Sequence, residues 1–195
     1  SHCVQSVRIV ELLEKKGEGL NLTGEVRDGI LNHQTAGKPN TLEGQIVRIS
    51  DKIAYINHDI EDAIRAGILK PSDLPENAVK ILGSTKSKRI TTLVSSIIEN
   101  GADEIRMTNK IKAAHDQLRS FMFEFVYTNP TAKKEEKKAK ILVEQLYEYF
   151  KKNPEKMPEE YIQICRKFDR DRAVCDYISG MSDGYAVDLY TELFV

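Results

Sequence analysis

The most regular hydrophobic pattern in the chain lies between Thr41 and Gly67. Apolar residues return there every three or four positions, which is the period of an amphipathic α-helix. Thr41 is a favourable N-cap residue, and Gly67 is a favourable residue for ending a helix. The residues that share the apolar face are Leu42, Ile46, Ile49, Ile53, Ile56, Ile60 and Ile64. The pattern therefore predicts one long helix that turns this face toward a hydrophobic core.

The same helical period recurs along most of the chain. The first stretch begins at residue 4 and stops at Gly17, a typical C-terminal residue of a helix. Further helices are predicted at 22–33, 76–82, 86–99, 109–128, 132–152, 157–168, 170–180 and 183–194. No run shows the alternation of apolar and polar residues that is typical of a β-strand. The sequence therefore predicts an all-α fold.

A continuous polar stripe lies opposite the apolar face of the long helix. It consists of Asp51, Tyr55, His58, Asp59 and Asp62. One interpretation is an ordinary solvated face, which every amphipathic helix has. However, the stripe lacks the long Lys and Glu side chains that are common on such faces, and aspartate is a poor helix former. Because carboxylates bind hard divalent cations and imidazole binds softer ones, the other interpretation is part of a metal or ligand site.

Composition narrows the class of protein. The 195 residues include 29 Lys and Arg against 30 Asp and Glu, which gives a formal net charge of −1. This balance argues against a broad basic surface for nucleic acid or anionic membranes. We interpret the lysine-rich run at 132–140 as the solvated start of a helix. No stretch approaches the roughly 18 to 20 apolar residues of a membrane span. Neither nucleic acid nor a membrane is expected as a partner.

The cysteines and histidines carry little further signal in the sequence alone. Cys3, Cys165 and Cys175 are too few and too scattered for a disulfide framework or a zinc site, and their small number favours the reducing cytoplasm. His33 and His115 are interpreted as structural residues. Because the chain starts without Met, its first two residues are either the remnant of an expression tag or the continuation of a longer protein.

Several motifs resemble one known family. Residues 41–47 read TLEGQIV and are followed at 49–59 by ISDKIAYINHD, while residues 2–8 form a His-x-x-Gln-Ser-x-Arg stretch. Similar stretches lie at 21–33 and 176–186. Together they resemble the HD-domain deoxynucleoside triphosphate triphosphohydrolases, the bacterial dGTPase-like group. The resemblance extends over nearly the whole chain.

The resemblance implies an all-helical HD-domain bundle that splits a dNTP into a deoxynucleoside and inorganic triphosphate with a divalent metal such as Mn²⁺ or Mg²⁺. Asp51 matches a metal ligand of the family. Lys52 and Tyr55 match positions that contact the triphosphate, and Asp59 matches a position that contacts the sugar. His2 matches a histidine proposed to act in catalysis. In that chemistry the metal activates a water that attacks the α-phosphorus, Lys52 stabilises the developing charge, and His2 protonates the leaving 5′ oxygen.

The chain departs from the family pattern at its beginning. The family's other metal-binding residues, a His and a His-Asp pair, precede the stretch at His2. The pair His58-Asp59 cannot replace them, because it follows Asp51 in the sequence. We therefore expect this chain to be the C-terminal part of such an enzyme, with the other metal ligands missing, and to be inactive without the N-terminal part.

The resemblance also sets expectations for organisation. Residues 1–68 are expected to form the rear part of the HD-type catalytic domain, and residues 69–195 a C-terminal helical region. A homo-oligomer is expected, and we interpret the aromatic run at 121–127 as core and oligomer surface. A second class of function stays open, which is a helical regulatory or interaction module that keeps the fold without catalysis.

Overall fold

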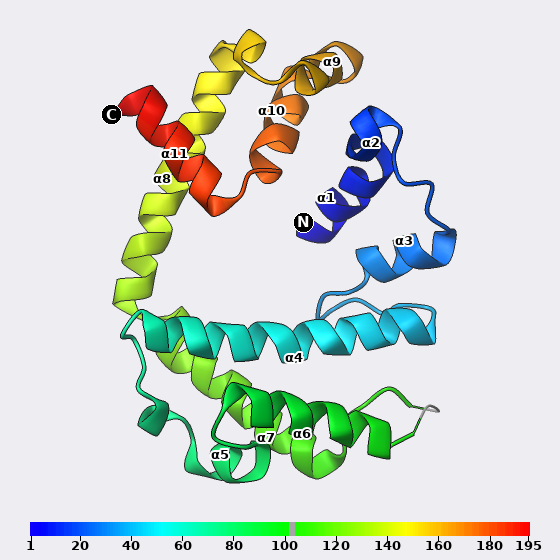
Figure 1. Cartoon of the computed structure of the whole chain (residues 1–195), viewed down its shortest axis with the longest axis vertical. Helices are drawn as coiled ribbons and strands as arrows, with labels where there is room; N and C mark the ends of the chain where they lie inside the picture. Colours follow the sequence, from blue (N-terminus) through cyan, green and yellow to red (C-terminus); the bar gives the residue numbers. More distant parts are fainter. Residues whose placement is uncertain (102–103) are drawn as a thin grey trace. The chain divides into compact units, whose positions relative to one another are not determined.

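The computed structural model describes residues 1–101 and 104–195, and every regular element within them is helical (Figure 1). This confirms the predicted all-α class. None of the described helices is both long and apolar enough to cross a lipid bilayer. The described residues form two compact units: unit 1 contains residues 1–7 and 22–133, and unit 2 contains residues 8–21 and 134–195. The boundary expected at residue 68 concerns the catalytic region and stays a prediction.

The helices of unit 1 begin and end close to the predicted positions. After α1 (His2–Arg8), they are α3 (Gly24–Leu31), α4 (Leu42–Arg65), α5 (Glu76–Leu82), α6 (Lys86–Glu99) and α7 (Asn109–Met122), which continues as a π-helix over Phe123–Tyr127. The side chains of Thr23, Thr41 and Thr85 each accept a hydrogen bond from a main-chain N–H of the first helical turn. Such caps satisfy amides that have no partner inside the helix, which is why these starts were predictable.

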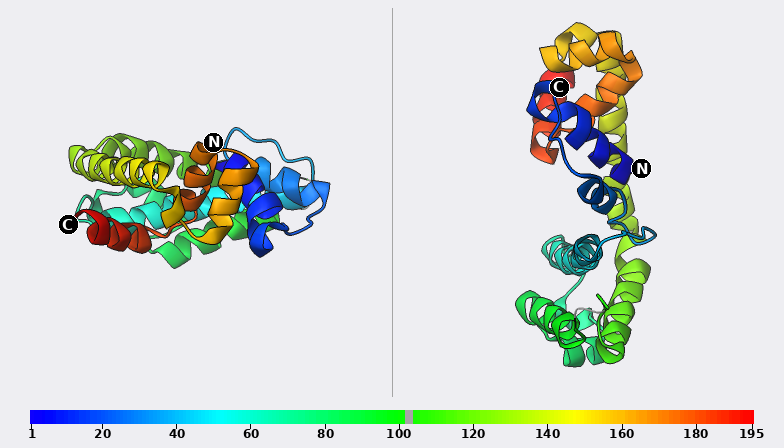
Figure 2. Two further views of the ribbon diagram at one scale, coloured as in Figure 1. Left: turned by 90° about the horizontal axis from the view of Figure 1, so that it is seen from above. Right: turned by 90° about the vertical axis from the view of Figure 1, so that its right-hand side faces the viewer.

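The core of unit 1 lies where α5, α6 and α7 pack together and α6 and α7 pack on α4 (Figures 1 and 2). From the predicted apolar face of α4, Ile53, Ile56 and Ile60 are buried. They join Leu93 of α6 and Leu118 of α7 in one cluster. Each fully buried aliphatic side chain of this kind stabilises the fold by about 1.5–3 kcal/mol. The central turns of the predicted apolar face are thus confirmed as core.

The first turns of the same face are not core. Leu42 and Ile46 are 49% and 48% exposed, so the prediction is wrong at this end of α4. The neighbour here is the short helix α3, which approaches α4 at Gly29 and Gly44. A Cβ added at Gly44 would lie 2.7 Å from the Pro39 side chain, so this close approach requires glycine.

Unit 2 is assembled from segments near both ends of the chain. It contains a π-helix over Ile9–Leu13, α2 (Glu14–Gly17), most of α8 (Pro130–Lys152), α9 (Glu159–Lys167), α10 (Arg170–Ser179) and α11 (Asp183–Phe194). The helix predicted to stop at Gly17 loses regular geometry slightly earlier, because Lys15 and Lys16 have φ angles of 51° and 60°. Short 3₁₀ turns at Pro71–Asp73 in unit 1 and Pro154–Lys156 in unit 2 complete the helical elements.

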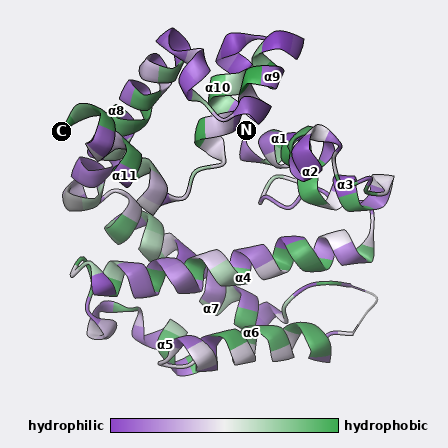
Figure 3. Cartoon of the chain, turned by 45° about the horizontal axis from the view of Figure 1, so that its top comes forward, coloured by the Kyte–Doolittle hydropathy of each residue, from purple (hydrophilic) through white to green (hydrophobic). Residues whose placement is uncertain are grey.

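Aromatic and aliphatic side chains fill the core of unit 2. Leu146 and Phe150 of α8 pack with Val174 and Tyr177 of α10. The rings of Phe150 and Tyr177 meet edge to face, with centroids 5.0 Å apart, which is a favourable arrangement for aromatic pairs. Figure 3 shows hydrophobic and hydrophilic residues interleaved along the helices, as expected when one face packs and the other is solvated.

A buried ion cluster also belongs to unit 2. The side chain of Asp176 on α10 is fully buried. Arg8 donates to both of its carboxylate oxygens, with Nη2 2.7 Å from Oδ2, and Arg172 adds a further ion pair of 2.9 Å. Because the carboxylate has two guanidinium partners, its burial is compensated. The cluster joins two segments that are 168 residues apart in sequence.

Candidate functional site

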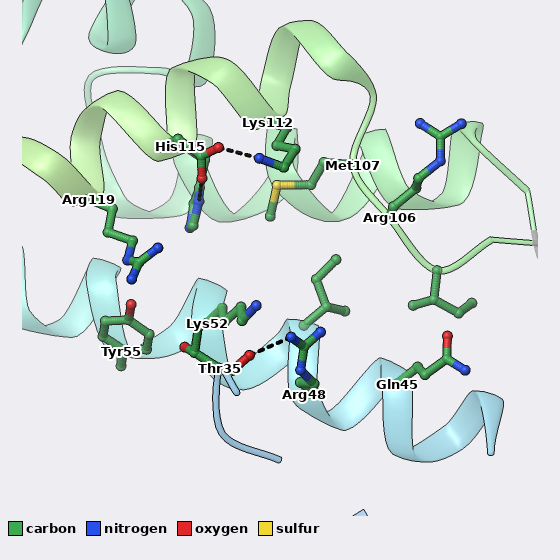
Figure 4. Close-up of a pocket in the computed structure, with 13 residues that line it drawn as sticks. Thr35, Gln45, Arg48, Lys52, Tyr55, Arg106, Met107, Lys112, His115 and Arg119 are labelled. Carbon is green, nitrogen blue, oxygen red and sulfur yellow. Dashed lines mark hydrogen bonds and ion pairs between the residues drawn. The ribbon is translucent and has the colours of Figure 1, made fainter. Parts of the chain in front are cut away.

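A cavity of about 220 Å³ lies in unit 1 between α4 and α7 (Figure 4). Its lining residues are Thr35, Gln45, Arg48, Ile49, Lys52, Tyr55, Ile105, Arg106, Met107, Lys112, His115, Asp116 and Arg119. Pockets for whole drug-sized ligands usually measure about 300–1,000 Å³. This cavity is therefore better matched to one polar group of a ligand than to an entire nucleotide.

The lining residues come from one face of each helix. On α4 they recur from Gln45 through Lys52 to Tyr55 at spacings of three or four, and on α7 they recur from Lys112 to Arg119 in the same way. Residues at this spacing share a helix face, so the two faces meet across the cavity. In Figure 4, Lys52 and Tyr55 of α4 lie opposite His115 and Arg119 of α7.

The cavity is strongly cationic. It is lined by five basic side chains and a single carboxylate, that of Asp116. Lys112 is paired with Asp116, and Arg106 is paired with Glu104. Arg48 donates to two main-chain carbonyl groups, those of residues 34 and 35. Three of the five cations therefore have partners among the described residues, and two lack a carboxylate partner there.

Lys52 and Arg119 are these two cations. No carboxylate lies within ion-pair distance of either among residues 1–101 and 104–195. Partial burial lowers the pKa of Lys52 below its usual range, and the neighbouring charges of Arg48 and Arg119 lower it further, while Asp116 acts in the opposite direction. A cation held in this way is stabilised by a bound anion. The cavity is therefore suited to a phosphate or polyphosphate group.

His115 adds a neutral polar group to the wall of the cavity. The residue is only 5% exposed, and burial lowers the pKa of its imidazole although the nearby Asp116 carboxylate raises it. Its Nδ1 lies 3.8 Å from Asp116. Within the described part of the chain, the buried Nε2 has no partner in hydrogen-bonding geometry, although the main chain at Lys52 faces the ring. The interpretation of His115 as structural fits its burial, and its position adds a role in the cavity wall.

Asp59 lies one helical turn beyond Tyr55 on α4, where it accepts a hydrogen bond from the hydroxyl of Tyr127. Burial and this bond to a carboxylate raise the pKa of Tyr127 far above its ordinary value, and the charge of Asp59 acts in the same direction. The phenol therefore stays protonated and remains a donor. Tyr127 is the last residue of the π-helix that follows α7.

The structure thus brings together some of the residues expected to form the site. Lys52 and Tyr55 line the cavity, and Asp59 follows on the same helix. Asp51 is exposed and does not line the cavity, because adjacent helical residues point about 100° apart. His2 does not line it either and lies instead beside Cys3 and His33. The catalytic, substrate and metal roles implied by the family remain predictions.

The divalent metal expected from the resemblance can be tested against the donor set around Asp51. Mg²⁺ and Mn²⁺ take several oxygen ligands in octahedral geometry. Among residues 1–101 and 104–195, the one group of three His, Cys, Asp or Glu side chains with converging ligand atoms does not include Asp51. The described residues therefore do not form this metal centre by themselves, and Asp51 offers one carboxylate toward it.

The α7 side of the cavity was not predicted from the sequence. Lys112, His115, Asp116 and Arg119 are spaced at offsets of three and four, so they share one face of α7. That spacing was visible in the sequence, but it is equally typical of any solvated helix face. Only the packing of α7 against α4 distinguishes a face that lines a cavity from a face that is solvated.

Known proteins are similar to this chain over its whole length. Residues 105–192 match the phosphohydrolase-associated domain. Over the full chain, a deoxyguanosinetriphosphate triphosphohydrolase-like protein of Caldanaerobacter subterraneus is 56% identical, and one of Clostridium tetani is 46% identical. The chain belongs to the deoxyguanosinetriphosphate triphosphohydrolase-like family. A further member, from Desulfatibacillum aliphaticivorans, is 35% identical over the full chain.

The matches cover all of this chain but only part of each relative. All of this chain is aligned in each of the three comparisons, but it covers 58%, 59% and 61% of the relatives' own lengths. The chain therefore spans about three fifths of the family members that it matches. The expected membership of the dGTPase-like family is confirmed.

Proposed function

We propose that this chain is the C-terminal part of a metal-dependent dNTP triphosphohydrolase, which converts dGTP or another dNTP into a deoxynucleoside and inorganic triphosphate. The observation that carries the proposal is the cationic cavity between α4 and α7, which contains Lys52 and Tyr55. The names of the relatives support the same reaction. We propose further that the chain is inactive alone, because Asp51 provides only one ligand to the metal centre.

Lys52 and Arg119 bind the triphosphate in this proposal. Both are cations without a carboxylate partner in the described part of the chain. A bound polyanion offsets the burial and the neighbouring positive charges that lower the pKa of Lys52. A cavity of about 220 Å³ accommodates a phosphate chain and leaves the rest of the nucleotide outside it. The developing negative charge on the phosphate oxygens is stabilised by these fixed cations, which need no reorganisation during the reaction.

Asp59 binds the sugar. The hydrogen bond from Tyr127 fixes one carboxylate oxygen and leaves the other able to accept a hydrogen bond from a sugar hydroxyl group. His2 donates a proton to the leaving 5′ oxygen. Asp51 contributes a carboxylate toward the divalent metal, which when bound supplies Lewis-acid activation of the phosphate.

The first experiment measures binding of inorganic tripolyphosphate to this chain by isothermal titration calorimetry. We expect Lys52→Gln and Arg119→Gln each to weaken binding by about tenfold or more, since a charge-assisted hydrogen bond contributes about 1.5–3 kcal/mol. Lys80→Gln is the matched control, because Lys80 is an exposed lysine of α5 outside the cavity. Equal binding by the unmodified chain and all three variants would show that tripolyphosphate does not bind in the cavity.

The second experiment uses the longer protein that includes the missing N-terminal part. We expect release of inorganic triphosphate from dGTP in the presence of Mn²⁺ or Mg²⁺. The substitution Asp51→Ala should abolish the release and leave the helical circular dichroism unchanged. A longer protein that binds tripolyphosphate but releases none from any dNTP would favour the alternative, a regulatory or interaction module without catalysis.

We also propose that the protein works as a homo-oligomer in the cytoplasm. Phe123 and Phe125 on the π-helix are 65% and 49% exposed, and exposed aromatic side chains of this kind support an interface. Light scattering of the chain and of the double variant Phe123→Ser, Phe125→Ser tests this. We expect a larger particle for the unmodified chain, and equal masses would count against the interface.

A further inference from the structure

The loop between α3 and α4 is closed at its two ends by one carboxylate, that of Asp28 on α3. Its Oδ1 accepts hydrogen bonds from the side-chain amides of Asn32 and Asn40, at 2.9 and 3.0 Å, and its Oδ2 accepts one of 2.7 Å from the main-chain N–H of Asn40. Between these ends, the N–H of Gly37 donates to the carbonyl oxygen of Gln34 at 2.9 Å. A Cβ added at Gly37 would lie 2.1 Å from the carbonyl oxygen of Asn32, so this tight turn requires glycine.

The middle of the loop is bound by Arg48 of α4. Its Nε lies 3.3 Å from the carbonyl oxygen of Gln34, and its Nη2 lies 2.6 Å from that of Thr35. These two nitrogens lie on one edge of the planar guanidinium group, so they reach two successive carbonyl groups at once. A lysine carries only one nitrogen and does not reproduce this paired contact. Figure 4 shows the contact between Arg48 and Thr35 as a dashed line.

This contact brings Thr35 to the cationic cavity. Thr35 lines the cavity together with Arg48 and Lys52, and Lys52 lies one helical turn after Arg48 on the same face of α4. Within the described part of the chain, the hydroxyl group of Thr35 makes no hydrogen bond. A hydroxyl group can donate to a phosphate oxygen. The loop therefore adds a neutral donor to a cavity whose other donors are mainly cations.

We propose that Arg48 is a positioning residue, which holds Thr35 at the cavity so that the threonine hydroxyl donates a hydrogen bond to the bound polyphosphate. This inference rests on the proposed function, because its ligand is the triphosphate of that cavity. Arg48 acts through the loop, whereas Lys52 acts on the anion directly. A donor that is held in place before binding loses little conformational freedom when the ligand arrives, which favours affinity.

Binding of inorganic tripolyphosphate to this chain, measured by isothermal titration calorimetry, tests both residues. Thr35→Val exchanges the hydroxyl for a methyl group and should weaken binding about tenfold. Arg48→Lys keeps the positive charge but loses the paired contact, and it should weaken binding by a similar factor. Two matched controls should bind like the unmodified chain. They are Arg65→Lys at the exposed end of α4 and Thr91→Val on the exposed face of α6, both outside the cavity.

The double variant separates positioning from a merely structural role. If Arg48 acts through Thr35, then Thr35→Val should weaken binding by less than about twofold when Arg48→Lys is already present, because the hydroxyl is no longer held there. Independent roles would instead multiply to a loss of about a hundredfold, and that result would overturn the proposal. The helical circular dichroism of Arg48→Lys should match that of the unmodified chain, since Asp28 still closes the loop.

Amide hydrogen exchange gives a readout that needs no ligand. The Gly37 amide should exchange faster in Arg48→Lys than in the unmodified chain, and equal exchange would count against the positioning role.

The outcomes also distinguish this inference from the proposed function. If Lys52→Gln weakens tripolyphosphate binding while Thr35→Val and Arg48→Lys do not, the positioning role fails and the cavity remains the binding site. If none of the three substitutions changes binding, both proposals fail.

Discussion

The hydroxyl group of Tyr127 fixes the orientation of the Asp59 carboxylate at the edge of the α4 face that lines the cavity. Asp59 was predicted to contact the sugar, whereas Tyr127 was read only as part of an aromatic run. In the structure the two residues act as a pair, because a protonated phenol can only donate to the carboxylate beside it. This gives Tyr127 a positioning role that can be measured separately from binding of the triphosphate.

Replacing Tyr127 with phenylalanine removes one hydrogen bond and little volume. In the longer protein, we expect Tyr127→Phe to lower kcat/KM for dGTP by about 10- to 100-fold, since a hydrogen bond to a charged group contributes about 1.5–3 kcal/mol. Tyr190→Phe is the control, because Tyr190 also donates a hydrogen bond, to Gln145 in unit 2. Equal losses in both variants would indicate a general effect on folding.

The single residue His115 makes the stability of the folded chain depend on pH. Burial lowers its pKa below the ordinary value of 6.5, so near and below that pH the unfolded chain binds a proton that the folded chain excludes. Stability therefore rises with pH between the lowered pKa and about 6.5, and it is lost as the pH falls through that window. The slope from one such group cannot exceed about 1.4 kcal/mol per pH unit.

Urea unfolding followed by circular dichroism between about pH 5 and pH 7.5 measures this slope. We expect His115→Gln to reduce the pH dependence of the free energy of unfolding in this window, because the variant has no proton to exclude. If the variant and the unmodified chain have the same slope, His115 does not carry the effect.

At the scale of elements, α4 and α6 are joined by a buried polar contact. Asn57 is fully buried and donates to the carbonyl oxygen of Ile53, while its own oxygen accepts a hydrogen bond of 2.8 Å from Arg89. Arg89 is 2% exposed, and its only carboxylate neighbour in the described part of the chain is Glu61, at 3.7 Å. The amide is therefore the closest partner of a buried positive charge.

The loss in free energy of unfolding should depend on whether one or both partners of the Asn57–Arg89 contact are replaced. We expect Asn57→Ala to destabilise the chain by about 3 kcal/mol or more, because it leaves the buried guanidinium group without its nearest acceptor. The double variant Asn57→Leu, Arg89→Met should recover part of this loss, since apolar replacement removes the uncompensated charge as well. Urea unfolding compares the variants, and a double variant less stable than Asn57→Ala alone would contradict this account.

Element boundaries were largely predictable from the sequence, whereas the contacts between elements were not. Local signals such as the caps at Thr41 and Thr85 act within a few residues, so they are visible in the sequence. The cavity depends on which helix covers Lys52, and nothing local to α7 specifies that Arg119 will face it. The resemblance supplied Lys52 and Tyr55 but not their partners.

The contact between Cys3 and His33 shows the same limit. His33 reaches Cys3 only after the chain folds α3 back toward α1, across 30 residues of sequence. A contact between residues so far apart has no fixed spacing in the sequence that would reveal it.

At the scale of the whole molecule, Asp176 makes a long-range connection that the sequence did not reveal. We expect Asp176→Asn to destabilise unit 2 by about 3–5 kcal/mol, because it leaves Arg8 and Arg172 without their shared buried carboxylate. Asp171→Asn is the control, because Asp171 makes an exposed pair with Lys151. Urea unfolding should shift for the first variant and not for the second, and similar shifts would argue against a special role of the buried cluster.

The same ion cluster has a consequence for the order of events on the ribosome. Arg8 is made before its partner Asp176, which follows 168 residues later. At about 5–20 residues per second, the early segment waits on the order of ten seconds or more before the carboxylate exists. During that interval residues 22–133 are already complete, so unit 1 is able to fold first. Unit 2 can close only after Asp176 has been made, so Arg8 is without this buried carboxylate until then.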